Sequence, residues 1–498
     1  MKKGTMMKVL ALGLVLVMAL TLFAGCGKEK VTSDPVAESD DDGFADASDY
    51  VYDGDGINTS GSSRPSGSNG QTSGSQSYVS YDNSHVQMTD NEKIFESIPT
   101  KLKGKTVKFA DWGEALADRY QKLIKQFEKE TGIKVNTIQY DESTFISKVA
   151  QAIAAGQSPD IAASNNTFPQ ALEVVQPLPK PFDPYDGFWD ERVSEATQVG
   201  NKQYFVNTRN SPFTGGYVVY YNKKIFNSNG LTTPDDYYKK GDWTYENMYK
   251  CIEEVSKYAD QAAILESITI AGQAGTGFIN YDSKTGTFTG TTQNETIVDS
   301  VKYMAKAAQA GYAGGYGIQS FGSGKVGLCM AGTYGTKYNG YFKDMKASDI
   351  GVVPLPTSYN GKKLEYMPLN YRGYGICKGV TDSDRIECAY YFLRYFLDMD
   401  KYDKNTAKGR AGIDIFANKV LEKYFRETQL VLFQNSKLYF EMFNGPLALV
   451  GTSWGANENF SAARRAAPDQ VAVELNKSDN VVKNAAEEAT KRVANFTK

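Results

Sequence analysis

The chain has 498 residues, of which 41% are hydrophobic and 23% charged, a composition typical of a soluble globular protein. This length exceeds that of one compact core, so we expect more than one domain. A net charge of −3 and a pI near 5.6 leave no basic face for nucleic acid, so we exclude nucleic acid as a partner.

The chain opens with the layout of an export signal. Three lysines among the first eight residues precede an apolar run over residues 9–23, shorter than the roughly 20 residues that a membrane-spanning helix needs. The run ends in FAGC, which resembles the lipobox of bacterial lipoproteins, although its first position is usually Leu, Val or Ile. We expect a signal peptide over residues 1–25 and a lipid anchor on Cys26. The alternative is an ordinary secreted protein in which this cysteine is incidental.

A polar segment follows, from Gly27 to about Ser80, rich in Ser, Gly, Asp and Asn. Such a composition cannot bury enough apolar surface to offset its ordering entropy. We therefore expect the anchor and a flexible acidic tether to fill residues 26–100. The run DGDG at 53–56 lacks the acidic twelfth ligand of a calcium loop, so we assign no metal there.

The folded part is expected to begin near Lys101, where KGKTVKFADWG alternates like a short strand. Apolar residues at helical spacing follow as far as Gly132, and the strand KVNTIQY comes next. A second amphipathic helix then leads to the strand IAAS. The order strand, helix, strand, helix, strand favours an α/β fold with a largely parallel sheet covered by helices.

This same region resembles the opening of the family 1 extracellular solute-binding proteins, which are sugar-binding lipoproteins of ABC importers and include maltose-binding protein. The pieces FEKETGIKV and AAGQSPDI carry the resemblance. Later pieces follow in the family's order, over about residues 103–470: QVGNKQYFVN, GGYVVYYNKKIFNSNGL, DWTYENMYKCIEEVSK, FGSGKVGLCMAGTYG, DIGVVPLPT and GYGICKGVTDSDRIECAYYFLRYFL.

The resemblance implies a two-lobed, type II periplasmic-binding-protein-like α/β fold with the ligand cleft between the lobes. It places the first lobe at 103–212 plus 370–425, and the second at 213–369 plus 426–498. Independently, ligands of open α/β sheets bind beyond the carboxyl ends of strands, and clefts between domains are preferred sites. Both arguments predict contacts from residues that follow strands.

The candidate ligand contacts come from strand ends and from positions that the family uses. A pyranose has an apolar C–H face and a rim of hydroxyls, which aromatic plates together with Asp, Asn and Arg can satisfy. Any single aromatic residue is still more often core than contact. The candidates are Asp111, Trp112, Glu114, Ser164, Asn165, Asn166, Tyr334, Arg372 and Trp454.

Arg372 departs from the family pattern, in which small residues, often glycine, precede the strand that returns to the first lobe. An arginine there can bind the carboxylate of an acidic sugar bidentately, through two parallel N–H···O bonds, or make an ion pair between the lobes. Trp189 is also left open between core and site. Trp243 is expected to pack inside, at the start of a second-lobe helix.

The resemblance implies the substrate-binding lipoprotein of an ABC importer. Such a protein captures a carbohydrate by hinge closure and delivers it to the permease subunits, and we expect the carbohydrate to be an oligosaccharide. We expect a monomer without a cofactor, lipid-anchored on the extracytoplasmic face of the cell membrane, and no enzyme. The single histidine, His85, lies at the edge of the tether, so a Ser-His-Asp relay or a histidine metal site has no base or ligand.

Two other functions stay open at this stage. A two-carboxylate glycosidase needs only a pair of acidic residues, and Asp190 with Glu191 or Asp111 with Glu114 supply such pairs. A surface adhesin that retains extracellular glycan fits the long tether and the many aromatic residues. An enzyme would release products, whereas an adhesin would hold insoluble glycan.

Four cysteines lie within the folded part, in apolar surroundings. Cys251 and Cys388 fall in helical patterns, and Cys329 and Cys377 fall in strand patterns. We expect them to be buried free thiols, although an exported protein can also pair its cysteines.

Overall fold

The computed structural model describes most of the chain beyond residue 90. The described residues are 91–112, 118–164, 168–208, 215–266, 269–314, 318–332, 342, 344–370, 372–398, 428, 437–440 and 458–497. The chain divides into two compact units, Met1–Thr72 and Ser73–Lys498, and every described residue belongs to the second. The expected signal peptide, Cys26, His85 and most of the expected tether lie outside the described residues.

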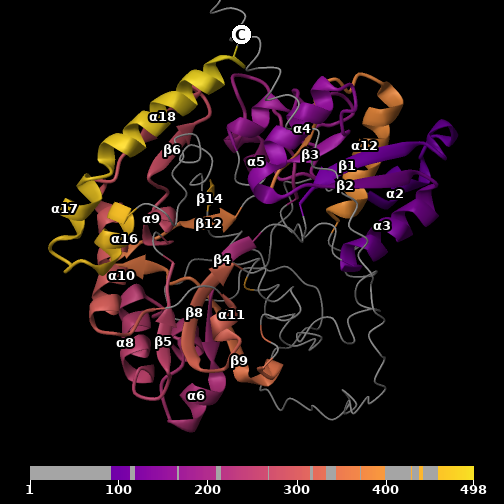
Figure 1. Ribbon diagram of the computed structural model, residues 1–498. Coiled ribbons are helices and arrows are strands. Elements are labelled where there is room, and N and C mark those ends of the chain that lie inside the picture. Colours follow the sequence, from indigo (N-terminus) through magenta and orange to yellow (C-terminus); the bar gives the residue numbers. More distant parts are fainter. Residues whose placement is uncertain are drawn as a thin grey trace, which may run out of the picture. The chain divides into compact units, whose positions relative to one another are not determined.

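The first sheet contains the strands predicted from the sequence (Figure 1). Its strands are β1 (Thr106–Asp111), β2 (Lys134–Gln139), β3 (Ile161–Ala163) and β13 (Tyr374–Ile376), in the order β13-β3-β1-β2. β1 runs parallel to β2 and to β3, with Phe109 opposite both Thr137 and Ile161. β13 runs antiparallel to β3. The prediction of a largely parallel sheet is confirmed.

The predicted helices lie between these strands in the chain. They are α3 (Asp118–Thr131) and α4 (Phe145–Ala154). α3 buries an apolar stripe that includes Leu123 and Phe127, and it ends before Gly132. Gly132 has a φ of +75°, a conformation that glycine adopts without steric cost, so it ends the helix as predicted.

A later helix, α12 (Ser383–Phe396), also covers the first sheet. Its N-cap Asp382 accepts hydrogen bonds from the backbone N–H groups of Asp384 and Arg385. On its buried face, the ring of Phe392 packs against that of Phe109 in β1, with centroids 5.1 Å apart. Residues far apart in the chain therefore share one core.

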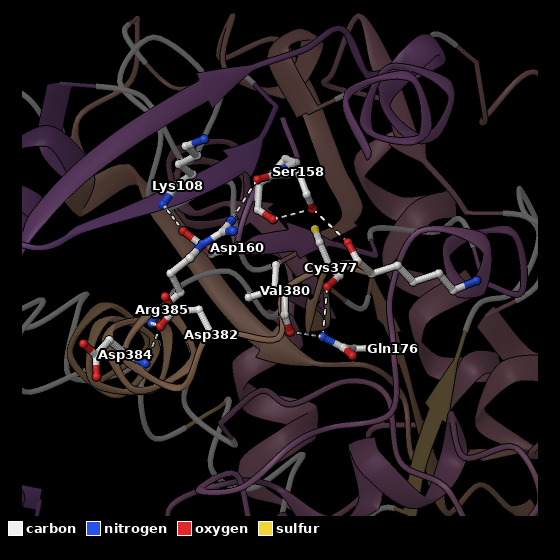
Figure 2. A network of polar contacts seen from close by, with 11 residues as sticks. Lys108, Ser158, Asp160, Gln176, Cys377, Val380, Asp382, Asp384 and Arg385 are labelled. Carbon is white, nitrogen blue, oxygen red and sulfur yellow. Dashed lines mark hydrogen bonds and ion pairs between the residues drawn. The ribbon is translucent and has the colours of Figure 1, made fainter. Parts of the chain in front are cut away.

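Asp160, directly before β3, ties this helix to the sheet (Figure 2). Its buried carboxylate accepts hydrogen bonds from Lys108 N at 2.6 Å and from Arg385 Nε at 2.5 Å. Arg385 also donates from Nη2 to Ser158 O at 3.0 Å. The backbone N–H of Cys377 donates to Asp160 O at 3.0 Å, so the end of β13 is held at the same point. Burial raises the pKa of Asp160, and the bonds from Lys108 and Arg385 oppose that rise.

The second sheet is built around β4, which pairs antiparallel with β8, β9 and β12. β5 runs parallel to β8, and β14 runs parallel to β12. The path through the sheet is β14-β12-β4-β8-β5. The strands are β4 (Gly215–Asn222), β5 (Gln261–Ile264), β8 (Val326–Gly332), β9 (Ile350–Pro354), β12 (Tyr366–Asn370) and β14 (Lys437–Phe440).

Trp243 packs inside this part, as predicted. It is 1% exposed, and its indole Nε1–H donates to Pro354 O at 2.8 Å. The next residue, Thr244, is the N-cap of α8 (Tyr245–Val255). The tryptophan therefore stabilises the start of this helix against β9.

The chain passes from the second sheet to the first over a very short distance. β12 ends at Asn370, opposite Gly215 of β4. Residues 371–373 follow, and β13 then begins at Tyr374, which is bridged to Val206. The chain links the two sheets twice. The two links are paired antiparallel beside the first sheet, at Val206 with Tyr374, and beside the second, at Gly215 with Asn370.

A hairpin of β6 (Ile279–Asp282) and β7 (Thr287–Gly290) packs against α18 (Asp479–Ala494), the long yellow helix labelled in Figure 1. Gly290 allows the close approach, because a Cβ there would lie 2.6 Å from Val482 O. Phe168, which follows the first sheet's β3, packs its ring on Tyr281 of the hairpin at 5.1 Å.

The folded part begins earlier than expected. A helix, α2 (Asn91–Glu96), lies within the range assigned to the tether. Its Phe95 packs edge-on against Tyr395 of α12, with ring centroids 5.5 Å apart. Two adjacent apolar residues, Ile94 and Phe95, do not make a helical pattern, so the sequence did not reveal this helix.

The remaining elements connect these parts. They are η2 (Thr100–Leu102), η3 (Glu142–Thr144), η5 (Gln170–Glu173), α5 (Glu191–Ala196), α6 (Lys223–Ser228), α7 (Pro234–Lys239), α9 (Thr269–Gln273), α10 (Glu295–Gln309), α11 (Ile318–Phe321), η7 (Ala347–Asp349), β10 (Ser358–Tyr359), β11 (Lys362–Lys363), α16 (Glu458–Arg465) and α17 (Val471–Asn476). Within the described ranges, no helix combines the length and the apolar character needed to span a membrane.

The four cysteines of the folded part are free and buried, as predicted. Burial raises the pKa of the thiols of Cys251 and Cys388 to about 12. It also raises the pKa of Cys329 and Cys377.

Asp479 fixes the start of α18 to the β6–β7 hairpin. Its buried Oδ1 accepts from Thr291 Oγ1 at 3.0 Å and from Thr292 N at 2.7 Å, and Lys483 Nζ lies 2.6 Å from Oδ2. Burial alone would raise the pKa of Asp479, but the bonds from Lys483, Thr292 and Thr291 hold it at about 2, below its ordinary 3.8.

We expect Asp479→Asn to lower the free energy of unfolding by about 1–3 kcal/mol at neutral pH, because the ion pair and one acceptor are lost. Since the folded pKa is depressed, the carboxylate's contribution is complete above pH 3.8 and is lost as the pH falls through about 2. Urea titrations at several pH values should show this acid-dependent contribution in the wild type and not in the variant. Asp469→Asn, at an exposed carboxylate, is the control, and an equal loss there would contradict the assignment.

Candidate functional site

The first sheet brings together four of the predicted contacts. Asp111 is the last residue of β1, Trp112 follows it, and Ser164 follows β3. Because β1 and β3 are parallel, their carboxyl ends lie at one edge of the sheet. β13 is antiparallel to β3, so the residues before it, including Arg372, arrive at the same edge.

Hydrogen bonds fix the backbone at this edge. Ser164 N donates to Gly373 O at 2.7 Å, and Gly373 N donates to Ser164 Oγ at 3.0 Å. The predicted contact Ser164 is therefore bonded to the residue next to Arg372. Its side chain is buried and positions the returning chain.

A buried ion pair joins Asp111 and Arg372. Arg372 Nη1 lies 3.6 Å from Asp111 Oδ2, and the two residues are 5% and 0% exposed. Asp111 ends β1, and Arg372 lies two residues before β13 of the same sheet. The pair is therefore formed within one sheet, whereas the sequence suggested either a ligand contact or a pair between lobes.

Trp112 completes the cluster as its aromatic member. The guanidinium of Arg372 lies over the Trp112 ring, with Cζ 4.5 Å from the ring centroid, a cation–π contact. The backbone N–H of Trp112 donates to Asp111 Oδ1 at 2.7 Å. The indole side chain is half-buried, so part of it is open to solvent.

Tyr374 belongs to the cluster, and the sequence did not predict it. Its hydroxyl donates to Asp111 Oδ2 at 3.4 Å. Burial, and then the charge of Asp111, hold the pKa of the Tyr374 phenol well above 10. The phenol is therefore neutral at physiological pH and acts as a donor to the carboxylate.

Asn207 is a second member of the cluster that the sequence did not predict. Its buried amide donates from Nδ2 to Arg372 O at 2.6 Å, and its Oδ1 accepts from Thr208 N at 2.8 Å. Asn207 ends the run YFVN, beside the bridge between Val206 and Tyr374. The strand-like run was a usable signal, but its partner strand lies far away in the sequence.

Glu266 follows a strand of the second sheet, as Trp112 and Ser164 follow strands of the first. It comes two residues after β5, which is parallel to β8, and burial raises the pKa of its carboxyl group while Arg464 lowers it in part. The rule that ligands bind beyond strand ends would have found this residue in the run AAILE. It is a further candidate contact.

The remaining predicted contacts Glu114, Asn165, Asn166, Tyr334 and Trp454 lie outside the described residues. Trp189, which the sequence left open, is 1% exposed and packs in the core with Phe182 and Phe188.

Two of the carboxylates weighed for a glycosidase, Asp190 and Asp111, are paired with arginine side chains of the protein. Asp190 is buried and is the N-cap of α5, and both its oxygens lie 2.8 Å from the side chain of Arg192. In the part of the chain that the structure describes, no group of three or more His, Cys, Asp or Glu residues is placed to hold a metal ion. The cluster presents an aromatic face bordered by charged and hydrogen-bonding groups.

Comparison with known proteins identifies the family of this chain. Residues 113–401, more than half of the chain, match the family described as bacterial extracellular solute-binding protein. The chain belongs to this family. The solute-binding protein therefore acts on the extracytoplasmic side of the membrane. No curated protein matches it in sequence.

Solved structures similar to this solute-binding protein show the same fold. The GacH receptor of Streptomyces glaucescens GLA.O, solved unliganded and with acarbose, is 17% identical, with a TM-score of 0.54 over 76% of this chain and 98% of that chain. The lacto-N-biose-binding protein of a Bifidobacterium longum ABC transporter is 13% identical, with a TM-score of 0.57 over 78% and 98%. UgpB from Mycobacterium tuberculosis, solved with glycerophosphocholine, is 16% identical, with a TM-score of 0.54 over 78% and 97%. The predicted two-lobed fold of solute-binding proteins is confirmed.

We expect Asn207→Ala to destabilise the protein by about 2–4 kcal/mol, because it leaves the buried Arg372 carbonyl and the Thr208 N–H without this amide. Urea denaturation of the variant and the wild type measures the loss. Asn229→Ala is the matched control, since its exposed amide also bonds a backbone carbonyl, at 2.7 Å. The same loss in both variants would show that Asn207 has no special role.

Proposed function

We propose that this solute-binding protein captures a carbohydrate, an oligosaccharide, for an ABC importer. The family supports solute capture, and similar structures from Streptomyces and Bifidobacterium hold acarbose and lacto-N-biose. The complex of UgpB with glycerophosphocholine means that the fold by itself does not fix the ligand. The choice of a carbohydrate therefore rests on the chemistry of the cluster at the end of β1.

The observation that carries the proposal is the half-buried Trp112 ring beside the buried carboxylate of Asp111. An aromatic face suits the C–H face of a sugar ring, and a carboxylate accepts hydrogen bonds from its hydroxyls. We propose the same role for the remaining candidate contacts. These are Glu114, Asn165, Asn166, Tyr334, Trp454 and Glu266.

We propose hinge closure as the mechanism. The proposed lobes are 103–212 with 370–425, and 213–369 with 426–498. β12 ends at Asn370 and β13 begins at Tyr374, so the chain passes between sheets of the two proposed lobes within a few residues, which supports a hinge between the lobes. A ligand that contacts both lobes shifts the population toward the closed form.

The proposed partners are a permease and, by lipid, the membrane. The permease subunits would recognise the closed form, and separate subunits would hydrolyse ATP, since the sequence has no GxxxxGK[ST] loop. The signal-like start and the FAGC ending support lipid attachment at Cys26. The protein would act as a monomer, by binding rather than catalysis.

A thermal-shift screen of the full chain in detergent tests the proposed function. The panel contains neutral oligosaccharides, uronates and peptides. We expect a clear upward shift with a soluble oligosaccharide that is recovered intact, because binding to the folded form alone at 100 times Kd stabilises it by about 2.7 kcal/mol. No shift with any sugar, or shifts with peptides only, would reject a carbohydrate ligand. Release of new reducing ends would instead indicate a glycosidase, and retention of only insoluble glycan an adhesin.

The anchor is tested separately. We expect Cys26→Ser to move the protein from the membrane fraction to the medium or the soluble fraction, since the thioether-linked lipid can no longer form. Ser33→Ala, a substitution in the same segment, should leave the protein in the membrane fraction. Membrane retention of the Cys26→Ser protein would contradict lipid attachment at this residue.

A further inference from the structure

We propose that the Asp111–Arg372 pair makes the site selective for uncharged ligands, so that the protein accepts a neutral oligosaccharide and rejects its uronate counterpart. The inference rests on the proposed function, because it names the class of carbohydrate. The sequence left two roles open for Arg372, which were contact with an acidic sugar and an ion pair. The ion pair with Asp111 argues against an acidic sugar.

The charge of Arg372 already has a partner inside the protein. Its Nη1 lies 3.6 Å from Asp111 Oδ2, and the two side chains are almost fully buried. Together they carry no net charge. A ligand carboxylate that approached Arg372 would also approach Asp111, and like charges brought together at a binding site cost several kcal/mol.

The guanidinium is also held in place. It stacks on Trp112, and the backbone of its residue is fixed by the hydrogen bond from Asn207 Nδ2 to its carbonyl. The next residue, Gly373, is bonded twice to Ser164. If the side chain turned toward a ligand carboxylate, it would leave Asp111 as a buried charge without its partner, which is strongly unfavourable.

The carboxylate of Asp111 is held by two further hydrogen bonds. Its Oδ1 accepts from Trp112 N at 2.7 Å, and its Oδ2 accepts from the Tyr374 hydroxyl at 3.4 Å. The enclosed pair is neutral as a unit, so it offers no uncompensated positive charge to a ligand that stacks on the half-buried Trp112 ring. A neutral sugar loses nothing by this, whereas a uronate finds no counter-charge.

Calorimetry on the full chain in detergent tests the selectivity. The probes are neutral di- and trisaccharides of glucose, galactose and mannose, each paired with the same sugar oxidised to the uronate at C6. We expect the best neutral sugar to bind at least about tenfold more tightly than its uronate partner. A uronate that binds more tightly than its neutral partner overturns this inference and leaves the carbohydrate function standing. Binding of no sugar overturns both.

Charge variants then test the cause. Asp111→Asn keeps the shape of the side chain and leaves Arg372 without its counter-charge, so the ratio of uronate to neutral affinity should rise by at least about tenfold. The double variant Asp111→Asn/Arg372→Gln removes both charges and should show no such rise. An unchanged ratio in a folded Asp111→Asn protein contradicts the proposal.

Two further variants keep the test decisive. If circular dichroism shows that Asp111→Asn does not fold, Arg372→Gln replaces it, because this variant leaves the carboxylate alone and should weaken uronate binding further relative to neutral sugar. A relative gain for uronates there overturns the proposal. Asp384→Asn, which removes one charge from a surface pair with Lys101 at 2.9 Å, should leave the ratio unchanged.

Discussion

The antiparallel pairing of β13 with β3 is the contact on which the whole site depends. It is fixed at one end by Asp160, whose carbonyl accepts from Cys377 N and whose carboxylate binds Arg385 of α12. At the other end, Ser164 and Gly373 bond each other twice. Because β13 runs opposite to β3, the chain enters the first sheet at the edge where β1 and β3 end. Without this direction, Arg372 would not reach Asp111.

The pairing also explains how two charges are tolerated in a buried place. Desolvation of an ion pair is costly unless further hydrogen bonds satisfy its atoms. Here the backbone N–H of Trp112 and the phenol of Tyr374 donate to the carboxylate of Asp111, and the guanidinium of Arg372 lies over the Trp112 ring. All of these groups lie on or beside strands of one sheet. The side chains of the cluster are therefore held in place by the protein itself.

The sequence predicted the parts of this site that depend on local pattern. Asp111 and Ser164 could be placed because each follows a strand whose alternation is visible in the sequence, and the same rule would have found Glu266. Tyr374 and Asn207 were missed because their positions follow from a strand pairing between distant segments, which no local pattern encodes. The role of Arg372 was open for the same reason, since its partner lies on the first strand of the fold. Trp189 was undecided because an aromatic residue carries no local mark of burial.

The buried thiols have a consequence for a protein that acts outside the cytoplasm. Many exported proteins are cross-linked by disulfides and lose stability when these are reduced. In the described part of this chain, the four cysteines lie in apolar surroundings that raise their pKa, so little of the reactive thiolate form exists at neutral pH. The folded unit draws its stability from packed side chains, and it can therefore keep the same structure in oxidising and reducing habitats.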